Sequence, residues 1–555
     1  MCNAGLALTN RLRLLSRREF GYVILQVRGH YPERTVVPRR RFPLSLLPWL
    51  ELPLSIEAFS ETLELIAGDP RLQGAVFLIS GLSAEPATLN SLRQAIIRFC
   101  ASGKQAVAYL HDLRMWPYYL ASACHLILAP KSATFQSAGL RAEAIFLKDT
   151  LALLGIEADF EAIAEYKVSP DTFRRSHMTE PHREMLESLL DSIYTHLLTA
   201  IAAGRNMTVE RIRDLFDSVP LSADQARELG LLDAICYEDE LPDYLGQEGK
   251  PARLIPWDQA QRFVIRPRRW TSRFRIGIIS IEGMIVPGTS RRLPFPLPLP
   301  AATTQAGANT LVRQLRAAAQ DRTLAAVVLH VDSPGGSAFA SDLIWREVVL
   351  LRRHKPVVAY MGNRAASGGY YVSVPANALF AQPTTLTGSI GIWGGKIVTR
   401  GLFAKIRANR EEVLRGKSAS LYADTAPFSD EERARIRAEI GAGYTRFKAR
   451  VGEGRCMTDE QVEAVARGRV WTGEQALTHG LIDELGDLRA AADKARELAG
   501  LDPRRHVRLV SVPVPKRYPR PTTPATDIAE WLNALSQLSQ ERLFALAPWM
   551  IRLKD

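Results

Sequence analysis

The 555-residue sequence has few cysteines and no long uncharged apolar run. Its five cysteines are scattered, which argues against a disulfide framework and is compatible with a reducing compartment. The segment from Met1 to Arg18 is rich in arginine and lacks an apolar stretch long enough for a signal peptide or a membrane anchor. No other stretch approaches the roughly 20 uncharged residues of a spanning helix. We therefore expect a protein that is cytoplasmic or associated peripherally with a membrane.

The sequence also lacks the signatures of several ligand classes. It contains no zinc-finger spacing, RNA-binding aromatic motif or basic helix, so the net charge of +12 points to solubility or an anionic membrane surface rather than to nucleic acid. It contains no Walker-type phosphate loop, and no motif requires a metal or a nucleotide. The 46% of hydrophobic residues is ample for buried cores. We expect a globular protein that needs no cofactor and binds no nucleic acid.

The most informative feature that is present is an internal repeat at an offset of about 250 residues. The segment Asp69–Ser80 (DPRLQGAVFLIS) corresponds to Asp321–Asp332 (DRTLAAVVLHVD), and Ser222–Asp233 (SADQARELGLLD) corresponds to Thr472–Asp483 (TGEQALTHGLID). Short apolar runs separated by helix-length segments indicate buried parallel strands joined by crossover helices. The sequence therefore predicts an α/β fold built from two tandem duplicated domains.

The repeat also sets the expected domain boundaries. The first repeat covers residues 20–235 and the second covers residues 272–500. Residues 236–271 are rich in proline, glycine and charge, which is typical of a linker. Residues 501–555 are predicted as an extended arm and an amphipathic helix, because apolar residues recur with roughly helical spacing from Ile528 to Leu553.

Ser367 is the candidate nucleophile. It lies in Ala-Ala-Ser-Gly-Gly at a predicted strand-to-helix junction, where small neighbours leave room for a substrate backbone and the start of the helix is positive. The alternative is that Ser367 only caps the following helix. A cap needed by the fold would recur in the first repeat, yet Met115 stands opposite Ser367 there. The second repeat is therefore the better candidate for catalysis.

A Pro-Gly-Gly turn after the preceding strand is also confined to the second repeat, since Ser83 and Ala84 stand opposite Gly335 and Gly336. Glycines there can turn the backbone sharply and direct amides at a developing oxyanion. No histidine lies in a motif with an acidic partner, and His330 is interpreted as a half-buried strand residue. A Ser-His-Asp arrangement thus has no local support, and a lysine whose pKa is lowered by burial is the other option for the base.

Five segments resemble the motifs of the signal peptide peptidase A family. DSPGGSAFAS, NRAASGGYY, TLTGSIGI and GRVWTGEQALTHGLIDELG lie in the second repeat, and AEYKVSPDTFRRSHMT in the first resembles the family's lysine segment. The likeness extends from about residue 20 to residue 500. It implies a Clp-protease and crotonase-like fold, an ATP-independent serine endopeptidase and, for double-length members, a ring-shaped homotetramer. The implied substrates are apolar peptides such as cleaved signal peptides.

The resemblance also implies roles for individual residues. Ser367 is expected to be the nucleophile and Lys167 the general base that takes its proton. Ser389, in TGSIG, is expected to orient the lysine. The amides of Gly335 and Gly368 are expected to form the oxyanion hole.

The sequence departs from the double-length pattern in two ways. It keeps Lys417 at the position that repeats Lys167, as single-domain relatives do; we interpret Lys417 as an exposed loop residue, with a role as the base left open. It also lacks the usual N-terminal anchor. Each repeat instead has a basic, proline-rich apolar insertion, at Val37–Pro53 and Pro287–Pro300. Each insertion is interpreted either as a loop over the rim of a ring or as a contact with an anionic membrane or with apolar peptides.

Two other functions stay open at this point. One is an inactive ring-forming scaffold that binds peptides or a membrane without cutting. The other is a crotonase-type acyl-CoA enzyme, which would share the fold and the oxyanion glycines but would leave Ser367 and Lys167 unexplained.

Overall fold

The computed structural model describes most of the chain. The described residues are 7, 9–11, 13, 21–34, 54–111, 113–136, 139–247, 249–267, 269–292, 304–515, 543–546 and 552–554. Most of the two basic insertions and of the predicted C-terminal helix lies outside these residues.

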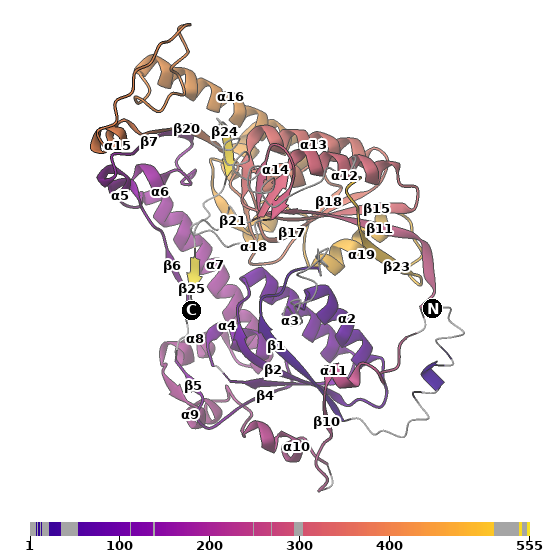
Figure 1. Ribbon diagram of the computed structural model, residues 1–555. Helices are drawn as coiled ribbons and strands as arrows, with labels where there is room; N and C mark the ends of the chain where they lie inside the picture. Colours follow the sequence, from indigo (N-terminus) through magenta and orange to yellow (C-terminus); the bar gives the residue numbers. More distant parts are fainter. Residues whose placement is uncertain are drawn as a thin grey trace. The chain divides into compact units, whose positions relative to one another are not determined.

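The chain forms two compact units whose boundaries do not follow the two repeats (Figure 1). The first unit contains Met1–Arg141 and Ile193–Trp270, and the second contains Ala142–Ser192 and Thr271–Leu553. The middle of the first repeat therefore folds with the second repeat. This exchanged segment, Ala142–Ser192, includes Lys167.

Within the described residues, the first unit is built on a six-stranded parallel sheet in the order β10-β1-β2-β3-β4-β9. The predicted apolar runs form these strands. Phe77 of the sheet contacts Phe59 of α2 and Phe99 of α3, so both helices pack on one face. The strands are β1 (Tyr22–Gly29), β2 (Gly74–Leu82), β3 (Gln105–Leu110), β4 (Leu126–Ala129), β9 (Ala234–Ile235) and β10 (Leu254–Pro256).

The helices of this unit lie between its strands in sequence. Strand β10 comes from the predicted linker and pairs with β1, so that part of residues 236–271 is folded into the first unit. Helix α7 carries the chain from the exchanged segment back to this unit. The helices are α2 (Ile56–Ala67), α3 (Pro86–Ala101), α4 (Met115–Ala121), α7 (Glu180–Arg205), α8 (Val209–Asp217), α9 (Ala223–Glu228), α10 (Leu241–Tyr244) and α11 (Trp257–Ala260). The short strands β5 (Thr134–Phe135) and β8 (Leu221–Ser222) pair with each other.

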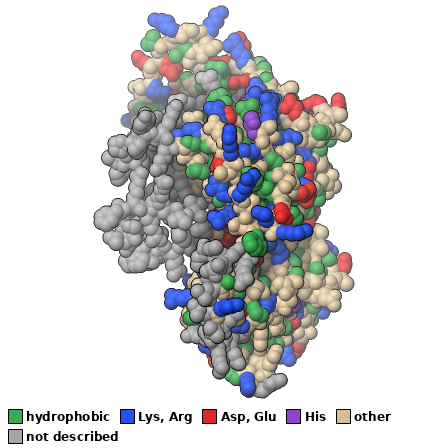
Figure 2. Space-filling model, turned by 90° about the vertical axis from the view of Figure 1, so that its right-hand side faces the viewer, with side chains coloured by type: hydrophobic (Ala, Val, Ile, Leu, Met, Phe, Trp, Pro, Cys, Tyr) green, Lys and Arg blue, Asp and Glu red, His purple; other side chains and the backbone are tan. Residues whose placement is uncertain are grey.

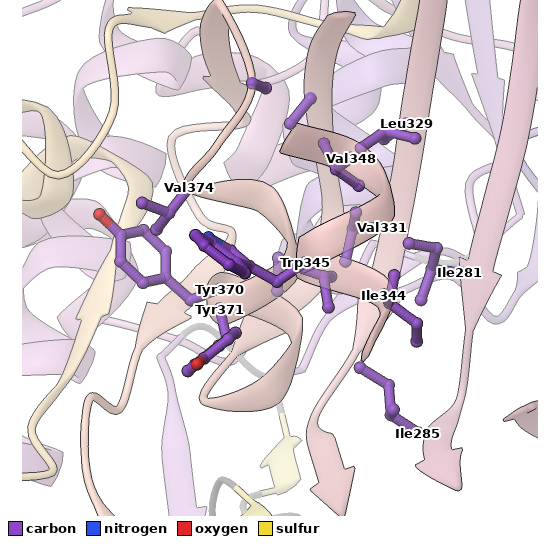
Figure 3. Close-up of a cluster of buried hydrophobic side chains, with 14 of the residues drawn as sticks. Ile281, Ile285, Leu329, Val331, Ile344, Trp345, Val348, Tyr370, Tyr371 and Val374 are labelled. Carbon is purple, nitrogen blue, oxygen red and sulfur yellow. The ribbon is translucent and has the colours of Figure 1, made fainter. Parts of the chain in front are cut away.

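The main sheet of the second unit has the order β21-β19-β17-β15-β11-β23, with β18 also paired to β17 and β22 to β18. Its strands are β11 (Thr271–Glu282), β15 (Leu324–Ser333), β17 (Val357–Ala366), β18 (Ala378–Ala381), β19 (Leu386–Gly388), β21 (Val470–Thr472), β22 (Glu484–Leu485) and β23 (His506–Ser511). Apolar side chains line both faces. On one face Ile281, Leu329 and Val331 lie beside Ile344 and Val348 of α13 (Figure 3).

Helices cover both faces of this sheet. Helix α19 (Leu488–Leu498) packs on the face opposite α13. The remaining helices of the unit are α5 (Lys148–Leu153), α6 (Asp171–Arg174), α12 (Ala308–Gln320), α13 (Ala338–Arg352), α14 (Gly368–Ser373), α15 (Arg400–Lys405), α16 (Asp430–Arg455), α17 (Asp459–Val465) and α18 (Gly473–Thr478).

A second, seven-stranded sheet of the same unit has the order β13-β14-β12-β16-β24-β20-β7. The exchanged segment enters it through β7, which pairs antiparallel with β20 over seven residue pairs. Residues 543–546 form strand β24 here, so the predicted helix is wrong for this described part. The strands are β7 (Glu157–Ile163), β12 (Met284–Val286), β13 (Arg291–Arg292), β14 (Thr304–Gly307), β16 (Gly335–Ser337), β20 (Ile392–Val398) and β24 (Leu543–Leu546).

Equivalent contacts in the two repeats confirm the tandem α/β duplication. The buried hydroxyl of Tyr118 donates to the carbonyl of Leu231 at 2.8 Å, and the hydroxyl of Tyr370 donates to the carbonyl of Leu481 at the same distance. Each tyrosine thus ties the helix that carries it, α4 or α14, to the turn after α9 or α18 near the end of its repeat.

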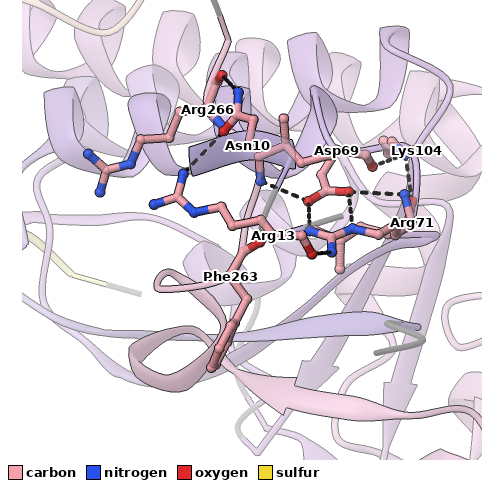
Figure 4. Close-up of polar contacts among 9 residues, drawn as sticks. Asn10, Arg13, Asp69, Arg71, Lys104, Phe263 and Arg266 are labelled. Atoms are coloured by element: carbon pink, nitrogen blue, oxygen red, sulfur yellow. Dashed lines mark hydrogen bonds and ion pairs between the residues drawn. The ribbon is translucent and has the colours of Figure 1, made fainter. Parts of the chain in front are cut away.

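A buried carboxylate holds one corner of the first unit (Figure 4). Asp69 accepts from the guanidinium of Arg71 and from the amide of Ile265, and Arg71 also donates to the carbonyls of Arg13 and Phe263. Burial alone would raise the pKa of Asp69, but these hydrogen bonds outweigh it and hold the pKa below its usual value. The cluster fixes the segment around Phe263 beside α2 and β2.

The surface of the described residues is mixed in charge. On the face in Figure 2, Lys and Arg side chains are spread widely, with Asp, Glu and apolar side chains between them. Within the part of the chain that the structure describes, no helix combines the length and the apolarity needed to cross a membrane.

Candidate active site

Ser367 lies between the end of β17 and the start of α14. Its backbone has φ 54° and ψ −113°, a strained conformation for a residue other than glycine. The Ser367 amide donates to the carbonyl of Gly388 at 2.7 Å, and the amide of Tyr371 donates to the Ser367 carbonyl at 2.8 Å. The Ser367 side chain makes no capping hydrogen bond to α14, so the interpretation of Ser367 as a helix cap is wrong.

The structure brings Lys167 and Ser389 to this serine. The Nζ atom of Lys167 lies 2.7 Å from Ser367 Oγ, 2.8 Å from the Ser389 carbonyl oxygen and 3.0 Å from Ser389 Oγ. All three residues are buried, with Lys167 only 1% exposed. Burial lowers the pKa of Lys167 well below its ordinary value, because the charged amine loses its hydration.

The segment around Lys167 is fixed by the pairing of β7 with β20, which ends at Ile163, four residues before the lysine. The turn before β21 also holds this segment, which the sequence analysis did not predict. Ion pairs join Arg467 to Glu165 and Arg469 to Glu184, the latter at 2.8 Å. Both arginines belong to the turn before β21: Arg469 is the second residue of the motif GRVWTGEQALTHGLIDELG, and Arg467 directly precedes this motif.

Apolar packing completes this support. Val168 lies in a buried cluster with Met185, Leu189 and Val470, so the residue after the lysine is anchored to α7 and to β21. In the aligned first repeat, Ser218 and Val219 stand where the second has Gly468 and Arg469. This difference between the repeats could have indicated from the sequence that the turn before β21 holds Lys167 in place.

Ser389 follows β19, the strand that pairs with β17 just before Ser367. Its backbone has φ 52°, and its amide donates to the Arg469 carbonyl at 2.7 Å. Its two oxygens therefore face the lysine from a position set by both β17 and the turn before β21. They form the polar side of an otherwise enclosed site for the lysine amine.

The two predicted oxyanion residues differ in the structure. Gly368 is the first residue of α14, so its amide has no acceptor within its own helix. The Gly335 amide instead donates to Ser333 Oγ at 3.1 Å, and that hydroxyl donates to the Gly283 carbonyl at 2.6 Å. Gly335 thus has to exchange this partner before it can bind an oxyanion. The start of α14 lies close to this turn, because a Cβ at Gly369 would be 2.7 Å from the Ser333 carbonyl oxygen.

The first repeat holds a different set of residues at the equivalent place. Met115 is fully buried at the start of α4, and its sulfur accepts from the amide of Gly139 at 3.2 Å. Lys417 is exposed, as expected for a loop lysine. His330 lies in strand β15 as predicted, but it is buried rather than half-buried, and its ring stacks on that of Tyr360 with the centroids 5.7 Å apart. Among the described residues, no group of three His, Cys, Asp or Glu side chains could hold a metal ion.

Comparison with known proteins identifies the family. The model of peptidase family S49 matches twice, at residues 98–250 and 350–502, which together make up more than half of the chain. The chain belongs to peptidase family S49. The double match follows the duplication, and its two parts contain Lys167 and Ser367 respectively.

Similar proteins extend the match to most of the chain. "Serine protease SPPA, chloroplastic" of Arabidopsis thaliana is 34% identical over 87% of this chain and 70% of its own length. "Protease 4" of Haemophilus influenzae is 29% identical over 86% of this chain and 79% of its own length. A solved structure, a ClpP1 mutant from Listeria monocytogenes, matches 39% of this chain and 94% of its own with 14% identity and a TM-score of 0.24. The expectation of a serine peptidase from this family is confirmed at this level.

Proposed function

We propose that this S49 peptidase is an ATP-independent endopeptidase with a serine-lysine dyad, which degrades apolar peptides such as cleaved signal peptides. One observation carries the proposal: a buried lysine amine lies 2.7 Å from the hydroxyl of a backbone-strained serine. An inactive scaffold or an acyl-CoA enzyme would leave this pair of residues without a use.

In the first step, Lys167 acts as the neutral amine. Two of its hydrogens are donated to the carbonyl and hydroxyl oxygens of Ser389, which directs the lone pair at Ser367. Lys167 takes the Ser367 proton as Oγ attacks the peptide carbonyl. The resulting tetrahedral oxyanion accepts a hydrogen bond from the Gly368 amide. It accepts a second one from the Gly335 amide once that amide no longer donates to Ser333 Oγ.

The protonated lysine then returns the proton to the leaving amine, and the peptide bond breaks to give an acyl-serine and a free amine. A water molecule next loses a proton to Lys167 and attacks the acyl group. The collapse of the second tetrahedral intermediate releases the acid and returns the proton to Ser367. The lowered pKa of Lys167 suits both directions of proton transfer, because an amine with an ordinary pKa of ~10.4 would stay charged at neutral pH.

A fluorophosphonate that traps activated serines tests the proposal. Wild type should be labelled at Ser367 and should hydrolyse an apolar peptide, whereas Ser367→Ala should lose both signals. Met115→Ala is the matched control, because Met115 stands at the equivalent position of the repeat that lacks a serine. Wild-type turnover in Ser367→Ala would refute the assignment.

We also propose that the protein assembles as a homotetrameric ring. The support comes from the duplication: β7 of the first repeat pairs with β20, whereas the segment that repeats β7, around Val413, forms no strand. This segment exposes apolar side chains, with Ile406 64%, Val413 84% and Leu414 45% exposed. By analogy with β7, it is suited to dock on the first repeat of a second copy.

A peripheral contact with an anionic membrane is proposed on chemical grounds. The net charge is +12, and both proline-rich insertions carry arginines beside Trp49 and Phe295. Arginines attract anionic lipid and aromatic rings bury apolar area at the lipid interface. The insertions lie mostly outside the described residues.

A further inference from the structure

The Gly335 amide, one of the two proposed oxyanion donors, is held by a side chain at the end of β15. It donates to Ser333 Oγ at 3.1 Å, and the same hydroxyl donates to the Gly283 carbonyl at 2.6 Å. Ser333 is fully buried. Its hydroxyl therefore forms a relay that links the amide in the Pro-Gly-Gly turn to the carbonyl that directly follows β11.

The first repeat makes the equivalent connection without a side chain. Three positions correspond in the aligned repeats: Gly29 to Gly283, Gly81 to Ser333 and Ser83 to Gly335. The amide of Ser83 donates directly to the carbonyl of Gly29 at 2.9 Å. The fold can thus close this corner with a backbone hydrogen bond. The repeat that carries the nucleophile instead has a hydroxyl between the two backbone groups.

The hydroxyl makes the amide of Gly335 easier to release. A main-chain carbonyl at the end of a strand is fixed by the sheet, whereas a serine hydroxyl can move by rotation of one side-chain torsion. Gly335 and Gly336 have φ of 99° and 157°, so the peptide planes of this turn are free of the restriction that a Cβ imposes. When the amide leaves, Ser333 still donates to the Gly283 carbonyl, and this buried carbonyl keeps its partner.

The relay lies next to the nucleophile. Ser333 pairs with Ala365 of β17, two residues before Ser367. A Cβ at Gly369, two residues after Ser367, would be 2.7 Å from the Ser333 carbonyl oxygen. Both segments that flank Ser367 therefore approach the residue that holds the Gly335 amide. A charged oxyanion accepts a stronger hydrogen bond than a neutral hydroxyl does, so an oxyanion formed at Ser367 can take this amide from Ser333.

We propose that Ser333 is a positioning residue: its hydroxyl keeps the Gly335 amide from closing onto the Gly283 carbonyl and releases it to the oxyanion of the transition state. This inference rests on the proposed endopeptidase function. It adds that the resting site holds one oxyanion donor on a side chain. Ser333 acts through the amide of Gly335 and not on the substrate itself.

Replacement of Ser333 by the residue of the first repeat tests this role. In Ser333→Gly, the Gly335 amide should close onto the Gly283 carbonyl. The same closure joins Ser83 to Gly29 in the first repeat. Because one oxyanion donor is lost, kcat should fall by about 100-fold, with little change in KM. Ser333→Thr keeps a hydroxyl at this position and should retain most of the wild-type kcat.

Ser341→Ala is the matched control. Ser341 is also fully buried, and its hydroxyl donates to a main-chain carbonyl, that of Ser337, at 2.8 Å. Loss of this bond should lower Tm about as much as Ser333→Ala does but should leave kcat unchanged. Ser333→Ala removes the relay without adding backbone freedom, so it should lose kcat as Ser333→Gly does. It decides the test if the glycine variant does not fold.

A peptide aldehyde and the corresponding peptide alcohol separate oxyanion binding from peptide binding. The aldehyde adds to Ser367 and places its oxygen in the oxyanion hole, whereas the alcohol binds without adding. In Ser333→Gly and Ser333→Ala, the inhibition constant of the aldehyde should rise by about the same factor as kcat falls. The inhibition constant of the alcohol should stay near its wild-type value.

The outcomes separate the two proposals. If hydrolysis depends on Ser367 but folded Ser333→Ala keeps the wild-type kcat, the positioning role is refuted and the endopeptidase stands. The role is also refuted if the aldehyde and the alcohol weaken equally, because Ser333 then only stabilises the turn. If wild type shows no Ser367-dependent hydrolysis, the proposed function fails and the role of Ser333 fails with it.

Discussion

Gly468 packs directly against the backbone of Lys167: a Cβ at position 468 would lie 2.5 Å from the Lys167 nitrogen and 2.6 Å from its Cα. Gly468 also has φ +83°, which disfavours any other residue. Gly468→Ala should therefore displace the lysine and lower kcat by about 100-fold, as a shift of roughly 1 Å can, with a smaller effect on KM. Steady-state kinetics of the purified variant would show this.

The control for this change is Gly441→Ala. Gly441 lies within α16, where an added Cβ meets nothing within 4 Å. Its kinetics should match wild type. Unchanged kcat in Gly468→Ala would mean that the close contact does not position Lys167.

The two lysines give the sharpest comparison of roles. Lys167→Ala should lower kcat by several orders of magnitude, because it removes the proposed general base. Lys417→Ala should change kcat far less, since its side chain is exposed. Hydrolysis rates of both variants would rank them, and the reverse ranking would assign the base to Lys417.

The lowered pKa of Lys167 predicts how stability changes with pH. Between the folded-state pKa and the ordinary value of ~10.4, the unfolded chain binds a proton that the folded chain does not. The contribution of Lys167 to the free energy of unfolding should therefore increase as the pH rises between these two pKa values. In Lys167→Met that contribution should vanish, and Tm near neutral pH should increase. Thermal melts of wild type and variant at pH values from about 6 to about 10, in steps of about one unit, would measure the difference in Tm.

The same shift sets the expected pH dependence of catalysis. The active form is the neutral amine, so kcat/KM should rise with pH through the folded-state pKa of Lys167, below the ordinary lysine range. A rising limb that lies at an ordinary lysine pKa would contradict the dyad as described.

The proposed ring makes a prediction about the exposed loop at Val413. Val413→Asp should weaken assembly, because it places a charge in an apolar contact between copies. Light scattering coupled to size exclusion should give a tetramer for wild type and a smaller species for the variant. Leu498→Asp should remain tetrameric, and a monomeric wild type would refute the ring.

Membrane association is tested by flotation with liposomes. Wild type should float with anionic vesicles at low salt and less at high salt, because lipid attraction through arginines is screened. Removal of residues 527–555 should reduce flotation, since this segment carries Trp549 and apolar residues. If wild type does not bind at low salt, the membrane proposal is wrong and a ring protease without membrane contact is the better account.

Much of the fold was predictable because parallel strands leave a local pattern. Buried runs such as those of β2 and β15 are nearly continuous in apolar residues, and their repetition fixed the duplicated α/β architecture. Residues 543–546 were predicted as helix from the spacing of their apolar residues. They form a strand instead, because the edges of β16 and β20 supply backbone partners that no local pattern reveals.

The candidate site was likewise only partly predictable from the sequence. Ser367 was singled out from its local motif and from the comparison of the repeats, whereas Lys167 and Ser389 were expected from the family resemblance. The structure places both serines beside Lys167. The support of Lys167 by Gly468 and the bond from the Gly335 amide to Ser333 were not foreseen, since each depends on a close approach between segments distant in sequence or on a side-chain rotamer.

The exchange of Ala142–Ser192 into the second unit has a consequence for the history of the chain. The first repeat has Met115 where the second has Ser367, yet it contributes the lysine amine and seven strand pairs to the proposed site. Neither repeat expressed alone would contain a full dyad in this arrangement. If the proposed dyad is correct, deletion of the first repeat would remove the general base, so selection for activity would keep both repeats in one chain.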